Sequence, residues 1–204
     1  MKKFLVTLMV IMFVVGAASS ASTALIDAVS ASGSGTYNNS PNPLLINHVI
    51  PEEGTWWTSS TNVWWNGTDP VFTIDLGSIY LVEDVVVSVD NNDDYEVEYS
   101  LDNTTWTHLF SIDDTYGDIP ESPGGMDTMS TDSSDGEYVS QIDFTQVQAR
   151  YLRIFSTDGD NMYAVGEVEA YGQPVPIPST IMLMGTGLLG LVGYNRKRFS
   201  KKGS

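Results

Sequence analysis

Four tryptophans lie within ten residues of sequence, at Trp56, Trp57, Trp64 and Trp65, among Thr, Ser, Asn and Gly. Sugars bind proteins by stacking their apolar C–H faces on exposed aromatic rings, while amide and carboxyl groups bond to the hydroxyls. We therefore predict a carbohydrate-binding site that includes Trp56, Trp64 and Asn66. The alternative is that one ring of each pair, Trp57 and Trp65, points into the core, because successive residues of a strand face opposite ways.

Residue patterns that would indicate catalysis do not occur in the sequence. The chain has no cysteine, which excludes thiol catalysis and disulfide bonds. It has no G-x-S-x-G elbow, and His48 and His108 are too far apart in the sequence to form a metal-binding pair such as H-x-x-x-H. Acids are abundant, but no pair is singled out for glycoside hydrolysis. We predict that the protein is not an enzyme.

Acidic and basic residues are segregated along the chain. All 26 Asp and Glu residues lie between Asp27 and Glu169, where the only Lys or Arg residues are Arg150 and Arg153. A surface of this charge repels nucleic acid and attracts divalent cations, so no nucleic-acid partner is expected. We expect both arginines to pair with carboxylates. The acidic run 90–94 is predicted to be a solvated turn.

Short β-strands are the dominant signal in the middle of the chain. Alternating or β-branched segments predict strands at 71–76, 81–89, 95–99, 106–110, 138–144, 151–155 and 165–171. The short Asp-Asn turn after 95–99 predicts a hairpin with 106–110. No segment has a sustained helical period, so we predict an all-β sandwich. Two polar stretches, 33–43 and 113–137, are predicted to be surface loops.

Five sequence segments carry a family resemblance when they are taken together. They are FTIDLGS (72–78), VVV (85–87), YEVEYS with NTTW (95–106), ARYLRI (149–154) and GEVEAYG (166–172). In this order they resemble the discoidin, or coagulation-factor type C, domain of the galactose-binding-like superfamily. The resemblance spans about 28–172 and implies a jelly-roll β-sandwich with both termini at one end. It also implies binding loops at the opposite end, as in many carbohydrate-binding members.

The same resemblance implies a structural calcium ion (Ca²⁺). In the resembling domains, a loop ending in Thr-x-Trp and a glutamate of the last strand supply oxygen ligands, which calcium requires. The corresponding loop here is 47–57. The implied ligands are Asn47, Glu52, Glu53, Thr55 and Glu167. The alternative is that Trp57 packs in the core and that the acids are solvated.

Residues 1–24 have the three parts of a secretory signal peptide. Lys2 and Lys3 precede an apolar run at 4–15, and small residues follow it. Twelve apolar residues are short for a membrane span. We predict export with cleavage after Ala21 or Ala24, which leaves one domain at 25–172.

Residues 173–204 combine a proline-rich hinge, a glycine-spaced apolar run at 181–194 and a basic end. The characteristic residues are Pro176, Ile177, Pro178, Ser179, Arg196, Lys197 and Arg198. This pattern resembles the PEP-CTERM sorting signal of exported proteins in exopolysaccharide-producing Gram-negative bacteria, with Ile177 in place of the usual glutamate. The resemblance implies transient membrane engagement and processing by an exosortase-like membrane transpeptidase. The alternative is a transmembrane helix that stays as a plain anchor.

The sequence therefore predicts an exported, non-catalytic protein of the cell surface, outer membrane or extracellular matrix of a Gram-negative bacterium. We expect it to bind extracellular polysaccharide through a discoidin-like sandwich and to be sorted through its C-terminal signal. The alternative is a structural or adhesive protein whose sandwich binds other proteins or itself.

Overall fold

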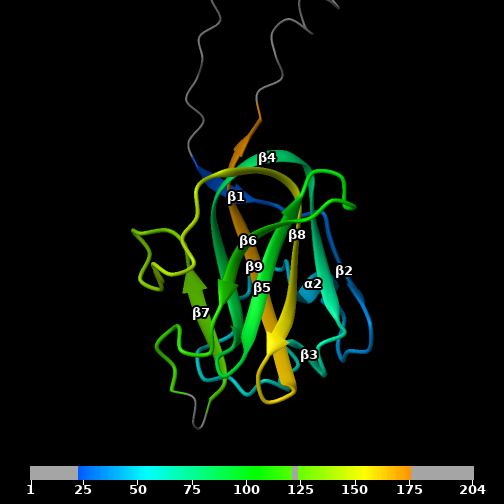
Figure 1. Ribbon diagram of the computed structural model, residues 1–204, viewed down its shortest axis with the longest axis vertical. Helices are drawn as coiled ribbons and strands as arrows, with labels where there is room; N and C mark the ends of the chain where they lie inside the picture. The colour runs from blue at the N-terminus through cyan, green and yellow to red at the C-terminus, as the bar shows by residue number, and fades with distance from the viewer. Residues whose placement is uncertain (1–22, 121–123, 176–204) are drawn as a thin grey trace, which may run out of the picture.

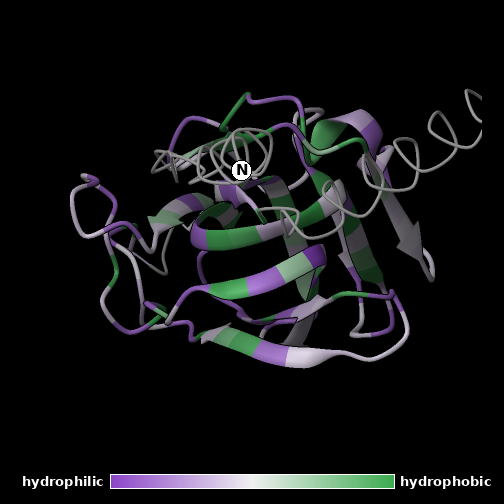
Figure 2. Ribbon diagram, turned by 90° about the horizontal axis from the view of Figure 1, so that it is seen from above, coloured by the Kyte–Doolittle hydropathy of each residue, from purple (hydrophilic) through white to green (hydrophobic). Residues whose placement is uncertain are grey.

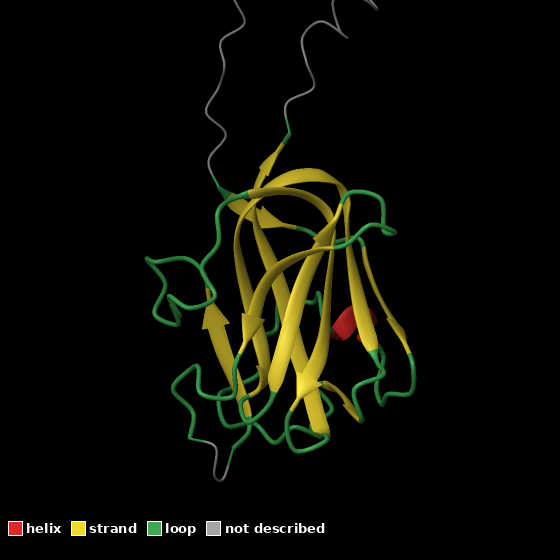
Figure 3. Cartoon of the chain, in the orientation of Figure 1, coloured by secondary structure: helices red, strands yellow, loops and turns green. Residues whose placement is uncertain are grey.

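The computed structural model describes residues 23–120 and 124–175 (Figure 1). In this part of the chain the regular elements are strands and one short helix, joined by loops and turns (Figure 3). The elements are β1 (Ala24–Ile26), β2 (Ser30–Ser34), α2 (Pro41–Leu44), β3 (Val63–Asn66), β4 (Val71–Asp90), β5 (Asp94–Ser100), β6 (Thr107–Ile112), β7 (Met126–Ser130), β8 (Val147–Asp158) and β9 (Met162–Pro174).

The strands form two layers because the long strand β4 takes part in both. Its first part pairs antiparallel with β2 and β8, and β8 continues to β5 and β6. Its last part pairs with β9 and β7, while β1 and β3 pair with the two ends of β9. The register of β4 shifts between Asp75 and Tyr80. Gly77 lies at this shift with φ +83°, a conformation that glycine adopts without strain.

The core lies between the two layers and is built from alternate residues of the strands. Along β4, for example, Phe72, Ile74 and Leu76 are buried, whereas their neighbours are half-exposed. Hydrophobic and hydrophilic residues accordingly alternate along the ribbon (Figure 2). Trp65 lies at the centre of an aromatic cluster, with its ring centroid 4.9 Å from that of Phe72 and 5.8 Å from that of Tyr163. This burial is the main stabilising contribution to the sandwich.

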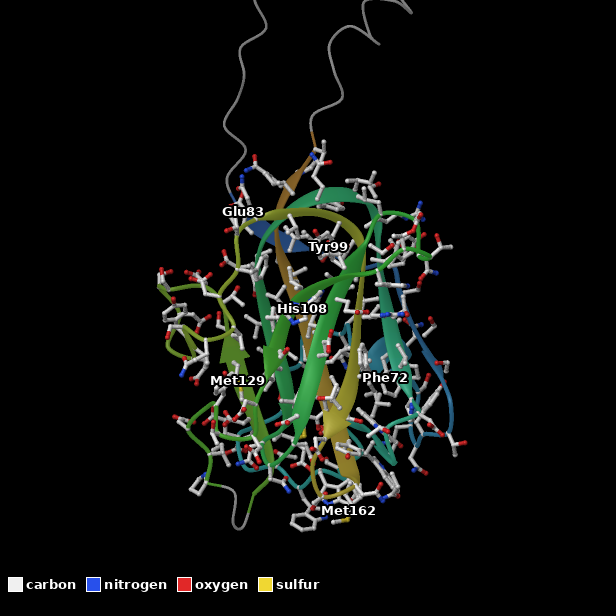
Figure 4. All side chains as sticks on the ribbon, in the orientation of Figure 1. Phe72, Glu83, Tyr99, His108, Met129 and Met162 are labelled. Carbon is white, nitrogen blue, oxygen red and sulfur yellow. The ribbon has the colours of Figure 1, made fainter. Side chains whose placement is uncertain are left out.

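Both ends of the described chain lie at the same end of the sandwich. Ala24 of β1 is paired with Gly172 of β9. Figure 4 places Glu83 at this end and Met162 at the opposite end. We call the end that holds Met162 the apical end; the turns that follow β3, β4 and β8 lie there (Figure 1). The arrangement of the termini agrees with the expectation from the discoidin resemblance.

Most of the predicted strands are confirmed, but three predictions were wrong. The strand expected at 138–144 is absent, because only Tyr138 forms an isolated bridge there. The loop expected at 113–137 contains β7, all five residues of which are buried. The loop expected at 33–43 contains the end of β2 and the helix α2. In β7 the polar residues are buried along with the methionines, so no alternating pattern marked it as a strand.

The predicted sorting signal beyond Val175 and the signal peptide up to residue 22 lie outside the described residues. Within residues 23–120 and 124–175, no helix is long and apolar enough to cross a membrane.

Candidate functional site

The four tryptophans occupy three different environments. Trp65 is fully buried, and its indole N–H donates to Ser156 Oγ at 3.3 Å. Trp64 packs edge-on against Trp57, with ring centroids 5.3 Å apart, and both are half-buried. Trp56 has 59% of its surface exposed. The alternative that the second tryptophan of each pair lies in the core is therefore correct for Trp65. Trp57 instead packs against Trp64, and Trp56 presents its ring to solvent.

The exposed ring of Trp56 projects from a loop whose backbone is fixed. The buried side chain of Asn62 donates its amide hydrogens to the carbonyl oxygens of Trp56 at 3.3 Å and Trp57 at 3.1 Å. The N–H of Ser59 also donates to the Trp56 carbonyl, at 2.9 Å. A fixed loop lowers the entropy that is lost when a ligand stacks on the ring.

Asn66 is exposed at the end of β3, where it holds the turn between β8 and β9. Its side-chain amide donates to the carbonyl of Asn161 at 3.1 Å, and Asn161 has φ +73°. The pairing of Asn66 with Met162 places this residue at the apical end. One amide hydrogen of Asn66 is therefore engaged in the turn, and the groups that remain for a ligand are its second amide hydrogen and its carbonyl oxygen.

Glu167, the predicted calcium ligand of the last strand, is fully buried and neither of its carboxylate oxygens has a hydrogen-bond partner of good geometry, although the backbone N–H groups of His48 and Val49 lie close enough to lower its pKa. Burial and then the nearby charge of Glu169 raise its pKa to about 7. Oxygens of Glu167, Glu169 and a ring nitrogen of His48 all lie within 4.8 Å of one another. A buried carboxylate without a partner is costly, so this position suits a bound cation.

The predicted calcium ligands do not all gather at Glu167. Asn47, in the loop before it, accepts a hydrogen bond from the N–H of Val49 at 3.0 Å. The Thr55 hydroxyl bonds to the carbonyl of Glu52, whose own side chain is exposed. The carboxylate of Glu53 lies instead with those of Asp118 and Asp127. The structure thus divides the predicted set between two acidic clusters.

His48 and Glu169 are site residues that the sequence reasoning missed. His48 Nδ1 lies 3.1 Å from Glu169 Oε1, and its Nε2 lies 3.4 Å from Asp27 Oδ1. The hydroxyl of Tyr171 donates to the other oxygen of Glu169 at 2.6 Å. The spacing of Glu167 and Glu169 was a usable signal, because residues two apart on a strand share a face.

Two acids of the run 90–94 are buried at the apical end, which corrects the prediction of a solvated turn. Asp90 and Asp93 are almost fully buried. Burial raises the pKa of Asp93 to about 8, and burial followed by the charge of Asp160 raises that of Asp90 to about 7. Asp93 accepts the N–H of Asp160 at 3.0 Å, so the carboxylate joins the turn after β4 to the turn after β8.

Both arginines pair with carboxylates, as predicted. The Nε of Arg150 donates to Asp75 Oδ1 at 3.1 Å, and its second nitrogen donates to the other oxygen at 3.2 Å. Arg153 bonds to Glu98 and lies 4.4 Å from the ring centroid of Trp106. Both arginines of β8 therefore already have a carboxylate partner.

The sequence profile of the F5/8 type C domain matches residues 26–169. The chain belongs to this family. No curated protein matches it in sequence. Among solved structures, it is similar to a truncated AlyQ with CBM32 and alginate lyase domains, at TM-score 0.50 and 18% identity. That match covers 77% of this chain but only 35% of the other, so the chain spans about a third of that protein.

Two further solved structures are similar to this chain. A fucolectin from the serum of the striped bass, Morone saxatilis, matches at TM-score 0.51 and 15% identity, covering 75% of this chain and 49% of the other. The CBM32 of AlyQ, in complex with 4,5-unsaturated mannuronic acid, matches at TM-score 0.49 and 18% identity, covering 72% of this chain and 97% of the other. For the matches at TM-scores of 0.50 and 0.51, identities of 18% and 15% make the likeness one of fold alone.

Proposed function

We propose that this F5/8 type C domain protein is a non-catalytic carbohydrate-binding protein that binds polysaccharide at its apical end. The observation that carries the proposal is the exposed ring of Trp56 on a backbone held by Asn62. Trp64 and Asn66 complete the predicted set, and the register of β3 with β9 places Asn66 at the apical end. The named carbohydrate-binding modules among structures of the same fold support this choice.

The charge of the apical end favours neutral sugars over uronic acids. Exposed carboxylates at this end include Asp158 at the end of β8 and Asp160 in the turn between β8 and β9, and both arginines are paired on β8. An anionic polysaccharide would bring further negative charge to this surface without a basic side chain to receive it. A sugar unit would therefore stack on Trp56 through its C–H face, while its hydroxyls bond to amide and carbonyl groups such as that of Asn66.

A structural calcium ion at Glu167 is part of the proposal. The buried carboxylate without a partner fits such an ion, and Asn47 and Thr55 lie in the loop that the family resemblance implies. The positive charge of the ion would balance the negative charge of the buried Glu167 carboxylate.

Export and sorting are proposed from the two ends of the sequence. The signal peptide would direct export, and an exosortase-like transpeptidase would process the PEP-CTERM-like tail during a transient stage at the inner membrane. Because β1 pairs with the end of β9, the first and last described residues lie at the end opposite the apical one (Figure 1). A protein held by its tail at the cell surface or in the matrix would thus direct its binding end outward.

The test of sugar binding is Trp56→Ala in a glycan-array and polysaccharide-retention assay with the purified protein. We expect the wild type to bind a neutral polysaccharide and Trp56→Ala to weaken that binding by up to about tenfold, since a single well-packed aromatic contact contributes up to about 1.5 kcal/mol. The matched control is Leu101→Ala, which removes an exposed apolar side chain after β5. This control should bind like the wild type.

Two results would contradict the proposal. Equal retention of wild type and Trp56→Ala would show that the ring is not the sugar platform. Calcium-dependent self-association without binding to any glycan would favour the structural or adhesive alternative.

A further inference from the structure

A second acidic cluster lies at the apical end, separate from Glu167. It consists of Glu53 from the loop before β3, Asp118 from the loop after β6, and Asp127 of β7. One carboxylate oxygen from each lies within 4.8 Å of the other two. Oxygens that coordinate one calcium ion at about 2.3–2.6 Å lie at most about 5 Å apart. The three groups are therefore close enough to bind the same ion without rearrangement of the backbone.

Main-chain hydrogen bonds bring these three segments together. The N–H of Gly54 donates to the carbonyl of Met126 at 2.8 Å, and the N–H of Met126 donates to the carbonyl of Thr55 at 2.8 Å. This pairing sets Glu53 beside the start of β7. Asp127 Oδ2 accepts the N–H groups of Asp118 and Ile119, each at 3.1 Å. The convergence of the carboxylates is therefore built into the fold.

One buried oxygen of this cluster has no hydrogen-bond partner. Asp127 is fully buried, and its Oδ1 is unpaired, although its other oxygen is engaged. An unsatisfied buried oxygen destabilises the folded state, and the cost is larger when the oxygen is charged. A bound cation would remove this cost.

No basic side chain of the described residues is available to balance the charge of these carboxylates. Arg150 and Arg153 pair with Asp75 and Glu98, and His48 lies between Asp27 and Glu169. His108 is bonded to Ser111 on β6.

We propose that Glu53, Asp118 and Asp127 form a second divalent-cation site, selective for calcium. The donors are all oxygens, which calcium prefers and which disfavour zinc. They come from three different segments, an arrangement that suits the flexible coordination of calcium better than the strict octahedron of magnesium. The ion joins the loop after β6 to the loop that carries Trp56, three residues beyond Glu53. The proposal stands independently of sugar binding.

The test is calorimetric titration of CaCl₂ into the metal-stripped protein, with thermal unfolding measured in parallel. Glu53→Gln and Asp118→Asn remove charge from exposed side chains, so folding should be retained. We expect the double variant to lose one calcium-binding event and to show a smaller rise of Tm with calcium. Each single variant should weaken that event by about tenfold or more, because ligand charge tunes calcium affinity. MgCl₂ and ZnCl₂ should bind more weakly at this site.

Two comparisons separate this site from others. Asp113→Asn makes the same charge change in another acidic cluster, which contains Asp94, Asp113 and Asp114, and should leave the binding event intact. In a Glu167→Gln background, calcium binding that persists and then disappears with Glu53→Gln and Asp118→Asn supports the proposal. Absence of calcium binding in that folded background, or unchanged binding in the double variant, overturns it.

Discussion

Neutralising Asp93 should change how the stability of this protein depends on pH. Asp93 is almost fully buried between the turns after β4 and β8, where its Oδ1 accepts the N–H of Asp160 at 3.0 Å. Its other oxygen lies 3.5 Å from the hydroxyl of Tyr95. Burial raises its pKa to about 8. Asp93→Asn keeps the acceptor oxygen and the size of the side chain but removes the charge.

The sign of the effect follows from the two states of the chain. Unfolded Asp93 loses its proton near its ordinary pKa of 3.8, whereas folded Asp93 keeps the proton up to about pH 8. The folded state therefore binds more protons across this window, and its stability falls as the pH rises from about 4 to about 8. A difference of about four units corresponds to about 5 kcal/mol at 1.36 kcal/mol per unit. The Asp93→Asn variant has no carboxyl group at this position, so its stability does not fall for this reason as the pH rises.

The assay is urea unfolding of wild type and Asp93→Asn at about pH 4 and about pH 8, with EDTA present to remove cations bound elsewhere. The stability advantage of the variant should grow by several kcal/mol between the two pH values. Asp93→Ala is the control, because it also removes the acceptor of the Asp160 N–H and should be less stable than Asp93→Asn at both pH values. Parallel pH profiles of wild type and Asp93→Asn would refute the reasoning.

Two further predictions concern the turn within β4 and the two ends of the chain. Gly77→Ala should destabilise the fold by about 1–3 kcal/mol in urea unfolding, because φ is +83° and the new Cβ would lie 2.8 Å from Val29 Cγ1. Gly136→Ala, whose Cβ would meet nothing within 4 Å, should be nearly neutral, and equal losses would contradict the argument. The intact mass of the exported protein should show cleavage after Ala21. Cleavage after Ala24 would remove Ala24 itself, the residue of β1 that pairs with Gly172 of β9. The same mass should lack 181–204, and retention of that segment would indicate a membrane anchor.

Local patterns carried most of the strand prediction. Segments such as 95–99 alternate apolar and polar residues because one face packs in the core and the other meets solvent. Strand β7 broke this rule, since Asp127, Thr128 and Ser130 are buried on both faces by loops from elsewhere in the chain. The segment 138–144 failed for the opposite reason: its apolar residues pack on the core from a loop, as Phe144 does against Phe110.

The site residues were predicted unevenly. An exposed member of the tryptophan set followed from the polar composition around it, but the sequence did not say that Trp57 would pack against Trp64. Glu167 followed from the family resemblance, whereas its neighbour His48 comes from a loop more than 100 residues away in the sequence. Glu53 was assigned to the same ion as Glu167, yet the pairing of Gly54 and Thr55 with Met126 directs it to Asp127.

The sequence by itself determined the class of the fold, the acidic character of the domain and the absence of thiol or disulfide chemistry. These properties are local or additive, because they depend on alternation along a strand, on charge counts and on residue types. Only the tertiary structure decided which acids are buried, which tryptophan is exposed and which carboxylates meet. These depend on contacts between distant segments, such as β7 with the loop before β3, and no local pattern encodes them. The two acidic clusters, around Glu167 and around Asp127, are thus products of the fold.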